Sequence, residues 1–200
     1  MGVLVGKPAP DFEVAAVLGT GEIVDSYKRS EAMQGKYGLV FFYPLDFTFV
    51  CPSELIALDH RMDKFRELGV EVVAVSIDSQ FTHNAWRNTA IKDGGIGAVT
   101  YTMAGDVNHD ICRAYDVESA GGVAYRGAFL IDKAGNVRSQ LVNDLPLGRN
   151  IDELIRLVEA LQFTDEHGEV CPAGWNKGDK GMNASPEGVA SYLAENAEAL

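Results

Sequence analysis

Runs of apolar and polar residues along the chain predict strands and helices in alternation. The segment Val70–Ile77 is β-branched and nearly all apolar, and Tyr37–Tyr43 is similar, so both are expected to be strands buried on two faces. Between them, apolar residues recur at helical spacing from Pro52 to Leu68, and Gly69 marks the end of that helix. This alternation predicts a three-layer α/β domain over residues 1–162.

The same patterns predict further elements on both sides of this unit. They are a hairpin of strands over 12–17 and 22–25, helices over 81–91, 107–115 and 151–161, a strand over 101–104, and a second hairpin over 127–132 and 137–142. Residues 163–200 are expected to form a C-terminal arm, because they hold too few apolar side chains for a core of their own. A last helix is expected to begin after Ser185, with Pro186 at its first position.

Net charge and cysteine content narrow the classes of function. The 200 residues carry a formal net charge of −12, which argues against nucleic acid and anionic membrane surfaces as partners. No apolar run approaches the length of a membrane span, and the N-terminus lacks the pattern of a secretory signal. Three cysteines without close spacing predict neither a disulfide scaffold nor a structural zinc site, and they favour a reducing, cytoplasmic location.

The most informative cysteine is Cys51. Pro44 ends the strand before it, and Pro52 suits the start of the following helix, so Cys51 is expected at a helix N-terminus. A thiolate there is stabilised by free N–H groups and by the positive end of the helix dipole. Thr48 lies three residues upstream, within reach of the same space. The alternative is an inert cysteine packed under the helix.

The other two cysteines differ in their surroundings. Cys171 lies in a polar, glycine-containing part of the arm, which favours either a surface cysteine without a role or a resolving thiol that condenses with oxidised Cys51. Cys112 alternates with the apolar positions of a short expected helix, so it is predicted to be a core residue.

Taken together, these segments resemble a typical two-cysteine peroxiredoxin from Pro8 to the last helix. Pro44, Thr48 and Cys51 match the peroxidatic pattern Pro-x-x-x-Thr-x-x-Cys, and Glu54 is the glutamate that follows it. The stretch from Glu169 to Trp175 matches the resolving pattern around Cys171, while Arg126 and Arg149 match two arginines of the family's active site. The resemblance implies a thioredoxin-like α/β fold, in which helices flank a central mixed sheet.

The resemblance also implies a reaction and its partners. Cys51 is expected to attack hydrogen peroxide or an alkyl hydroperoxide and to become a sulfenic acid, which Cys171 of the partner subunit then converts to a disulfide. Thioredoxin or a flavoprotein disulfide reductase is the expected electron donor. The family forms antiparallel homodimers that assemble into ring decamers, and it uses neither metal nor cofactor.

The residue types are suited to this chemistry. Arg126 and Arg149 can hold Cys51 ionised and stabilise negative charge on the departing oxygen. Thr48 can accept a hydrogen bond from one peroxide oxygen and direct the other at sulfur. Pro44 can shield the sulfur from water, and Glu54 can orient an arginine.

Two other functions stay open at this point. One is a non-enzymatic role, as a redox-switched holdase chaperone or a peroxide relay. The other is a disulfide oxidoreductase, which is disfavoured because position 54 is Glu, so Cys51 lacks the near partner of a Cys-x-x-Cys pair.

Overall fold

The computed structural model describes residues 2–199 of the chain, and a mixed seven-stranded sheet dominates its first part. The strand order is β2-β1-β5-β4-β3-β6-β7. The strands are β1 (Glu13–Val17), β2 (Ile23–Lys28), β3 (Tyr37–Phe42), β4 (Val70–Ser76), β5 (Thr102–Gly105), β6 (Arg126–Ile131) and β7 (Val137–Asn143). Strands β3, β4 and β5 run parallel, and the neighbours on both sides of this trio are antiparallel, which confirms the expected mixed sheet.

The chain divides into two compact units, residues 1–151 and residues 152–200. Beside the sheet, the first unit holds α1 (Arg29–Ala32), α2 (Cys51–Asp59), α3 (Met62–Glu67), α4 (Gln80–Asn88), the 3₁₀ turn η1 (Ile91–Asp93) and α5 (Asp110–Ala114). The second holds α6 (Ile151–His167), α7 (Pro186–Asn196) and the turn η2 (Ala197–Ala199). The boundary expected after residue 162 falls inside α6, which runs on to His167, whereas the division by contacts comes at the start of that helix.

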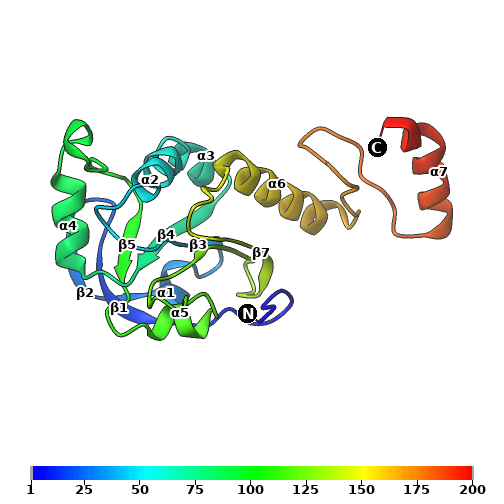
Figure 1. The fold of residues 1–200 in the computed structure, drawn as a ribbon. Coiled ribbons are helices and arrows are strands. Elements are labelled where there is room, and N and C mark those ends of the chain that lie inside the picture. Colours follow the sequence, from blue (N-terminus) through cyan, green and yellow to red (C-terminus); the bar gives the residue numbers. More distant parts are fainter. Residues whose placement is uncertain (1, 200) are drawn as a thin grey trace. The chain divides into compact units, whose positions relative to one another are not determined.

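In the first unit the helices cover both faces of the sheet. Figure 1 shows α2 and α3 on one side and α1 and α5 on the other. Every residue of β3 and β6 is buried, as is nearly every residue of β4, so the apolar runs correctly predicted strands covered on two faces. No helix within residues 2–199 has both the length and the apolar character needed to cross a bilayer.

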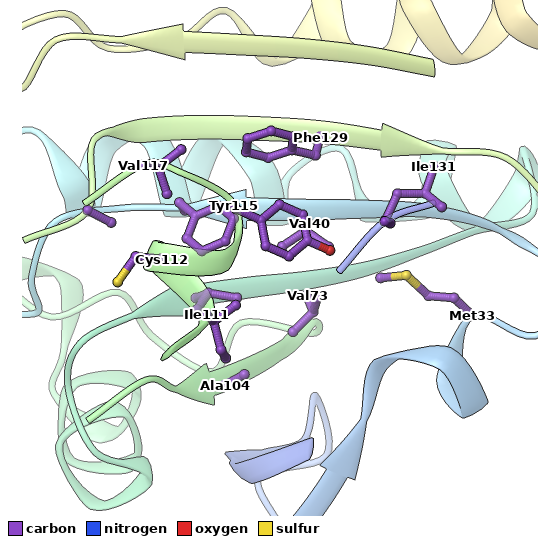
Figure 2. Packing of buried hydrophobic residues seen from close by; sticks show 14 of the residues in the cluster. Met33, Val40, Val73, Ala104, Ile111, Cys112, Tyr115, Val117, Phe129 and Ile131 are labelled. Carbon is purple, nitrogen blue, oxygen red and sulfur yellow. The ribbon is translucent and has the colours of Figure 1, made fainter. Parts of the chain in front are cut away.

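The core on the α5 side contains the second cysteine. Figure 2 shows Ile111 and Cys112 of α5 close to Val40, Val73 and Phe129 of the sheet. Cys112 exposes only 1% of its surface, so its prediction as a core residue is confirmed. Close aromatic pairs tighten the same layer, because the Tyr115 ring lies 5.1 Å from that of Phe42 and 4.9 Å from that of Phe129.

The prediction of a single helix over residues 52–68 is wrong. The structure has two helices there, α2 and α3, separated at His60 and Arg61, and α2 begins one residue earlier than expected, at Cys51. Leu55, Leu58, Met62 and Phe65 are all buried on both sides of the break. The apolar face therefore continues through the interruption, which explains why the hydrophobic pattern alone did not reveal it.

Candidate active site

A short loop brings Cys51 to the end of the sheet. Strand β3 ends at Phe42, buried Tyr43 and Pro44 follow, and the chain enters α2 at Cys51. No side chain caps this helix, and Pro52 occupies its first turn, where the missing N–H has no cost. Cys51 exposes only 1% of its surface. Its thiol therefore lies at a helix start, as the prolines on either side of it predicted, and it is also away from bulk water.

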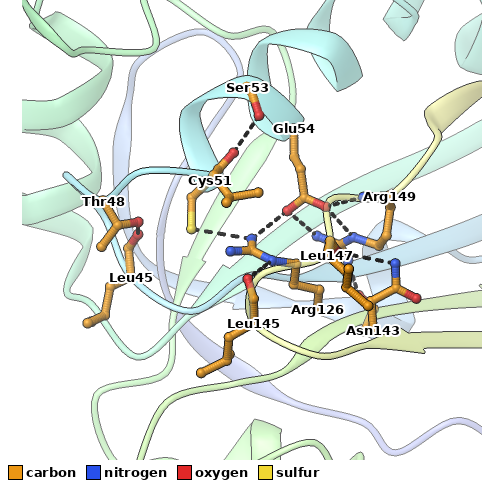
Figure 3. A network of polar contacts seen from close by, with 12 residues as sticks. Leu45, Thr48, Cys51, Ser53, Glu54, Arg126, Asn143, Leu145, Leu147 and Arg149 are labelled. Atoms are coloured by element: carbon orange, nitrogen blue, oxygen red, sulfur yellow. Dashed lines mark hydrogen bonds and ion pairs between the residues drawn. The ribbon is translucent and has the colours of Figure 1, made fainter.

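Arg126 is the charged residue that contacts the sulfur. Arg126 begins β6, and its Nη1 donates to Cys51 Sγ at 3.5 Å and to Glu54 Oε2 at 2.7 Å. Its Nε donates to the carbonyl oxygen of Leu145 at 2.7 Å. Figure 3 shows the guanidinium between the sulfur and the carboxylate. Because two other groups hold this cation, its position next to the sulfur does not depend on the sulfur itself.

Glu54 links the two arginines that the sequence singled out. Arg149 Nε and Nη2 donate to its two carboxylate oxygens at 2.9 and 3.1 Å, and the Arg149 backbone N–H adds a third bond at 2.7 Å. Burial raises the pKa of Glu54, but the hydrogen bonds and charge of Arg149, helped by the charge of Arg126, outweigh it and leave the pKa below its usual value. The carboxylate is therefore ionised at neutral pH.

Arg149 is tied to the site by its hydrogen bonds to Glu54, and its charge also interacts with Cys51. Its Nη1 donates to the Gly127 carbonyl oxygen at 2.6 Å, and its guanidinium carbon lies 3.4 Å from the centre of the Phe41 ring. Burial lowers the pKa of Arg149, and the hydrogen bond and charge of Glu54 oppose this shift. Two arginines and one glutamate leave one excess positive charge beside Cys51, which a thiolate balances.

Thr48 and Pro44 lie on the loop that leads to Cys51. The Thr48 hydroxyl donates to the Leu45 carbonyl oxygen at 2.8 Å, so its proton is engaged and its lone pairs are left to accept. In Figure 3 the sulfur is seen between Thr48 and Arg126. Pro44 is buried. The structure thus gathers Cys51, Glu54, Arg126 and Arg149 into one network, with Thr48 and Pro44 on the adjoining loop.

Cys171 belongs to the second unit, where it is half-buried on the loop that follows α6. Its Sγ lies 3.5 Å from the Ala160 carbonyl oxygen and 3.7 Å from Thr164 Oγ1. All three cysteines are free thiols. Within the described residues, no three His, Cys, Asp or Glu side chains converge in a way that would hold a metal ion.

Sequence reasoning missed a second polar cluster that holds the loop before Cys51. His83 is fully buried, its Nδ1 is 2.8 Å from Asp46 Oδ2, and its Nε2 is 3.2 Å from the Ala104 carbonyl oxygen. The Tyr43 hydroxyl donates to the other Asp46 oxygen at 2.7 Å. Burial raises the pKa of Asp46, opposed by its hydrogen bond and charge interaction with His83. The four histidines looked scattered in sequence, and only the fold brings one of them to this loop.

Sequence analysis also missed the backbone acceptors at the site. The carbonyl oxygens of Leu145 and Gly127 fix the two arginines, yet neither side chain carries a signal for this role. These acceptors come from β6 and from the segment after β7, which meet α2 only in the folded chain.

Comparisons with known proteins cover nearly the whole chain. The model of the AhpC/TSA family matches residues 5–140, and that of the C-terminal domain of 1-Cys peroxiredoxin matches residues 160–195. Alkyl hydroperoxide reductase C of Helicobacter pylori is 54% identical over 194 residues, which are 97% of this chain and 98% of that protein. Peroxiredoxin-2 of Macaca fascicularis is 49% identical, over 96% of each chain.

A solved structure shares the fold over nearly the whole chain. The reduced 2-Cys peroxiredoxin of Plasmodium vivax superposes with a TM-score of 0.94 at 44% identity, covering 96% of this chain and 100% of that one. Sequence, fold and the thiol–arginine pair point the same way. The chain belongs to the AhpC/TSA family and is a peroxiredoxin, a peroxidase that works through a cysteine thiol.

Proposed function

We propose that Cys51 is the peroxidatic residue of this enzyme and that its substrates are hydrogen peroxide and alkyl hydroperoxides. The Cys51 thiolate attacks one oxygen of the peroxide, so an S–O bond forms while the O–O bond breaks. The other oxygen takes a proton and leaves as water or an alcohol, and Cys51 is left as a sulfenic acid. The observation that carries the proposal is the 3.5 Å contact between Arg126 Nη1 and Cys51 Sγ.

Each neighbouring residue has one part in this step. Arg126 favours the thiolate and stabilises charge on the departing oxygen, because it is held in place before the reaction begins. Glu54 orients Arg126, and Arg149 neutralises Glu54 and keeps its carboxylate in position. Thr48 accepts a hydrogen bond from the peroxide, and Pro44 shields the sulfur from water.

The second step uses Cys171 of the partner subunit in an antiparallel homodimer. Its thiolate attacks the Cys51 sulfur, the S–S bond forms, and the S–O bond breaks with loss of hydroxide, which becomes water. Thioredoxin or a flavoprotein disulfide reductase then reduces the disulfide. We further infer assembly of the dimers into a ring decamer, and a cytoplasmic location, which the odd number of free cysteines supports.

Peroxide consumption by single cysteine variants tests the assignment. Cys51→Ser should lose essentially all peroxide reduction, even in the first turnover and without reductant. Cys171→Ser should keep that first turnover and lose the disulfide, which mass spectrometry after one equivalent of peroxide detects. Loss of the first turnover in Cys171→Ser, or its retention in Cys51→Ser, would show that the roles are assigned wrongly.

A further inference from the structure

The loop that carries Cys171 is held to one face of α6 at two residues, Cys171 and Trp175. At the first, Cys171 Sγ donates to the Ala160 carbonyl oxygen at 3.5 Å. At the second, the Trp175 carbonyl oxygen accepts a hydrogen bond from Arg156 Nη1 at 2.7 Å. Positions 156, 160 and 164 follow one another at four-residue intervals, so their side chains share one side of the helix.

Arg156 is oriented toward this loop by a second residue of α6. Its Nε and Nη2 donate to the two carboxylate oxygens of Glu153 at 2.6 and 2.7 Å. This paired geometry fixes the plane of the guanidinium and directs the remaining nitrogen, Nη1, at Trp175. The hydrogen bonds that Arg156 donates to Glu153 are also the main reason that the pKa of Arg156 is raised. The bond to the loop is therefore made by a held, fully charged donor.

Trp175 gives the bond a firm anchor. It exposes only 3% of its surface, its ring lies 4.9 Å from that of Phe163, and its Nε1 donates to the Asp179 carbonyl oxygen at 3.1 Å. Hydrogen bonds in both directions between Val170 and Met182, at 2.9 and 3.0 Å, fasten the chain on the other side of Cys171. The segment between these anchors cannot shift far while they hold.

In this arrangement the Cys171 sulfur is turned toward its own helix. Its proton is donated to a backbone carbonyl, a bond that only the neutral thiol can make, whereas the attacking species is the thiolate. A disulfide also requires Cα atoms within about 4.4–6.8 Å of each other. Cys171 must therefore leave the face of α6 before it can react with another cysteine.

We propose that Arg156 is a positioning residue that latches the Cys171 loop to α6, and that release of this latch limits the rate of disulfide formation. The inference rests on the proposed function, in which Cys171 resolves the Cys51 sulfenic acid. While the latch is closed, the sulfenic acid stays exposed to a second peroxide, which transfers an oxygen to it and yields sulfinic acid with release of water or an alcohol. Arg156 thereby sets the share of Cys51 lost to overoxidation.

The test measures the two oxidation steps separately in the full-length protein. Arg156→Met keeps the aliphatic stem and removes the donors. Because a charge-assisted bond that is partly open to solvent is lost, disulfide formation should become about fivefold faster, with less sulfinic acid at a given peroxide concentration. Arg156→Lys keeps one donor, so it should lie between Arg156→Met and wild type. The rate of the first step, Cys51 to sulfenic acid, should not change in either variant.

Lys180→Met is the matched control. It removes the same charge from the same unit, at an exposed lysine that forms an ion pair with exposed Glu195, so disulfide formation should keep its wild-type rate. Glu153→Gln weakens the orientation of Arg156 without removing it and should speed the step less than Arg156→Met does, which guards against a poorly folded variant. Unchanged or slower disulfide formation in Arg156→Met would overturn the latch. If wild type forms no Cys51–Cys171 disulfide at all, it is the proposed function that fails.

Discussion

Cys51 and Cys112 are buried alike and lie in similar places, yet they face opposite charges. Each exposes 1% of its surface, and each sits in the first turn of a helix that covers the sheet. Cys51 Sγ is 3.5 Å from Arg126 Nη1, whereas Cys112 Sγ donates to Asp106 Oδ2 at 2.8 Å. Burial therefore does not separate these thiols, and the difference lies in the sign of the nearest charge.

The surroundings of Cys112 keep it in the neutral form. Burial raises the pKa of its thiol, and the hydrogen bond to Asp106 and the charge of that carboxylate raise it further. Asp106 also accepts the backbone N–H groups of Ile111 and Cys112, so it serves the start of α5 as well. A cation beside a buried thiol has the opposite effect and favours the nucleophilic thiolate. The comparison teaches that the sign of the neighbouring charge, and not burial, distinguishes the two thiols.

The largest expected effect comes from removing the anion that holds the charges beside Cys51. Glu54→Gln leaves Arg126 and Arg149 buried without their carboxylate, which should lower the free energy of unfolding by about 3–5 kcal/mol at pH 7. Urea denaturation followed by circular dichroism measures this loss. Glu71→Gln, which breaks the partly exposed pair with Lys36, is the control and should cost less than about 1 kcal/mol. A similar small loss in both variants would contradict the role of Glu54.

The difference in unfolding free energy between wild type and Glu54→Gln should change with pH in a defined direction. Because the folded protein holds the pKa of Glu54 below its usual value of 4.5, the ionised carboxylate stabilises the fold above that pH. This stabilisation is lost as the pH falls through the lowered folded value. The difference in unfolding free energy between wild type and Glu54→Gln should therefore shrink below about pH 4.5.

The second effect concerns the cation itself. Arg126→Ala removes the donor that contacts the sulfur and should slow the reaction of Cys51 with peroxide about 10²–10³-fold. Arg126→Lys should recover only part of the rate, because an ammonium cannot bond the sulfur, Glu54 and the Leu145 carbonyl in the same plane. Stopped-flow oxidation across a range of pH provides the measurement. Arg138→Ala, on the neighbouring strand β7, should react at the wild-type rate.

The smallest effect is expected at the other cysteine. In Cys112→Ser a hydroxyl replaces the thiol and can still donate to Asp106, so the free energy of unfolding should fall by only about 1 kcal/mol. The rate of peroxide reduction should stay at the wild-type value, as the same stopped-flow assay would show. A clear loss of peroxidase activity in this variant would break the contrast between the two cysteines.

The sequence allowed much of this molecule to be predicted, because its strongest signals are local. The eight neighbouring residues Val70–Ile77 predicted a buried strand, and β4 occupies seven of them, Val70–Ser76. Pro44 and Pro52 predicted a strand end and a helix start, which placed Cys51 correctly between them. Resemblance to the family added Arg126 and Arg149, whose positions on β6 and after β7 carry no local signal of their own.

The remainder depended on contacts between distant segments. Glu54 was expected to orient one arginine, but it binds two, which are 72 and 95 residues away along the chain. His83 meets Asp46 across 37 residues, and no periodicity links them. The break at His60 left the apolar face intact, so the pattern of hydrophobic residues did not reveal it. Local spacing predicts elements, whereas the partners of buried charges are decided by the packing of those elements.

The Thr48 hydroxyl gives the site a polarity with a consequence for substrate choice. Its proton is bound to the Leu45 carbonyl, so the hydroxyl can only accept from a ligand, while Arg126 offers only donors. A hydroperoxide, which has one O–H and one adjacent oxygen with free lone pairs, satisfies both. A dialkyl peroxide has no proton for Thr48 and would leave that oxygen unpaired, the kind of mismatch that a polar site rejects by about 10⁴–10⁵-fold. We expect the direction of one hydroxyl to separate two classes of compound that share the same O–O bond.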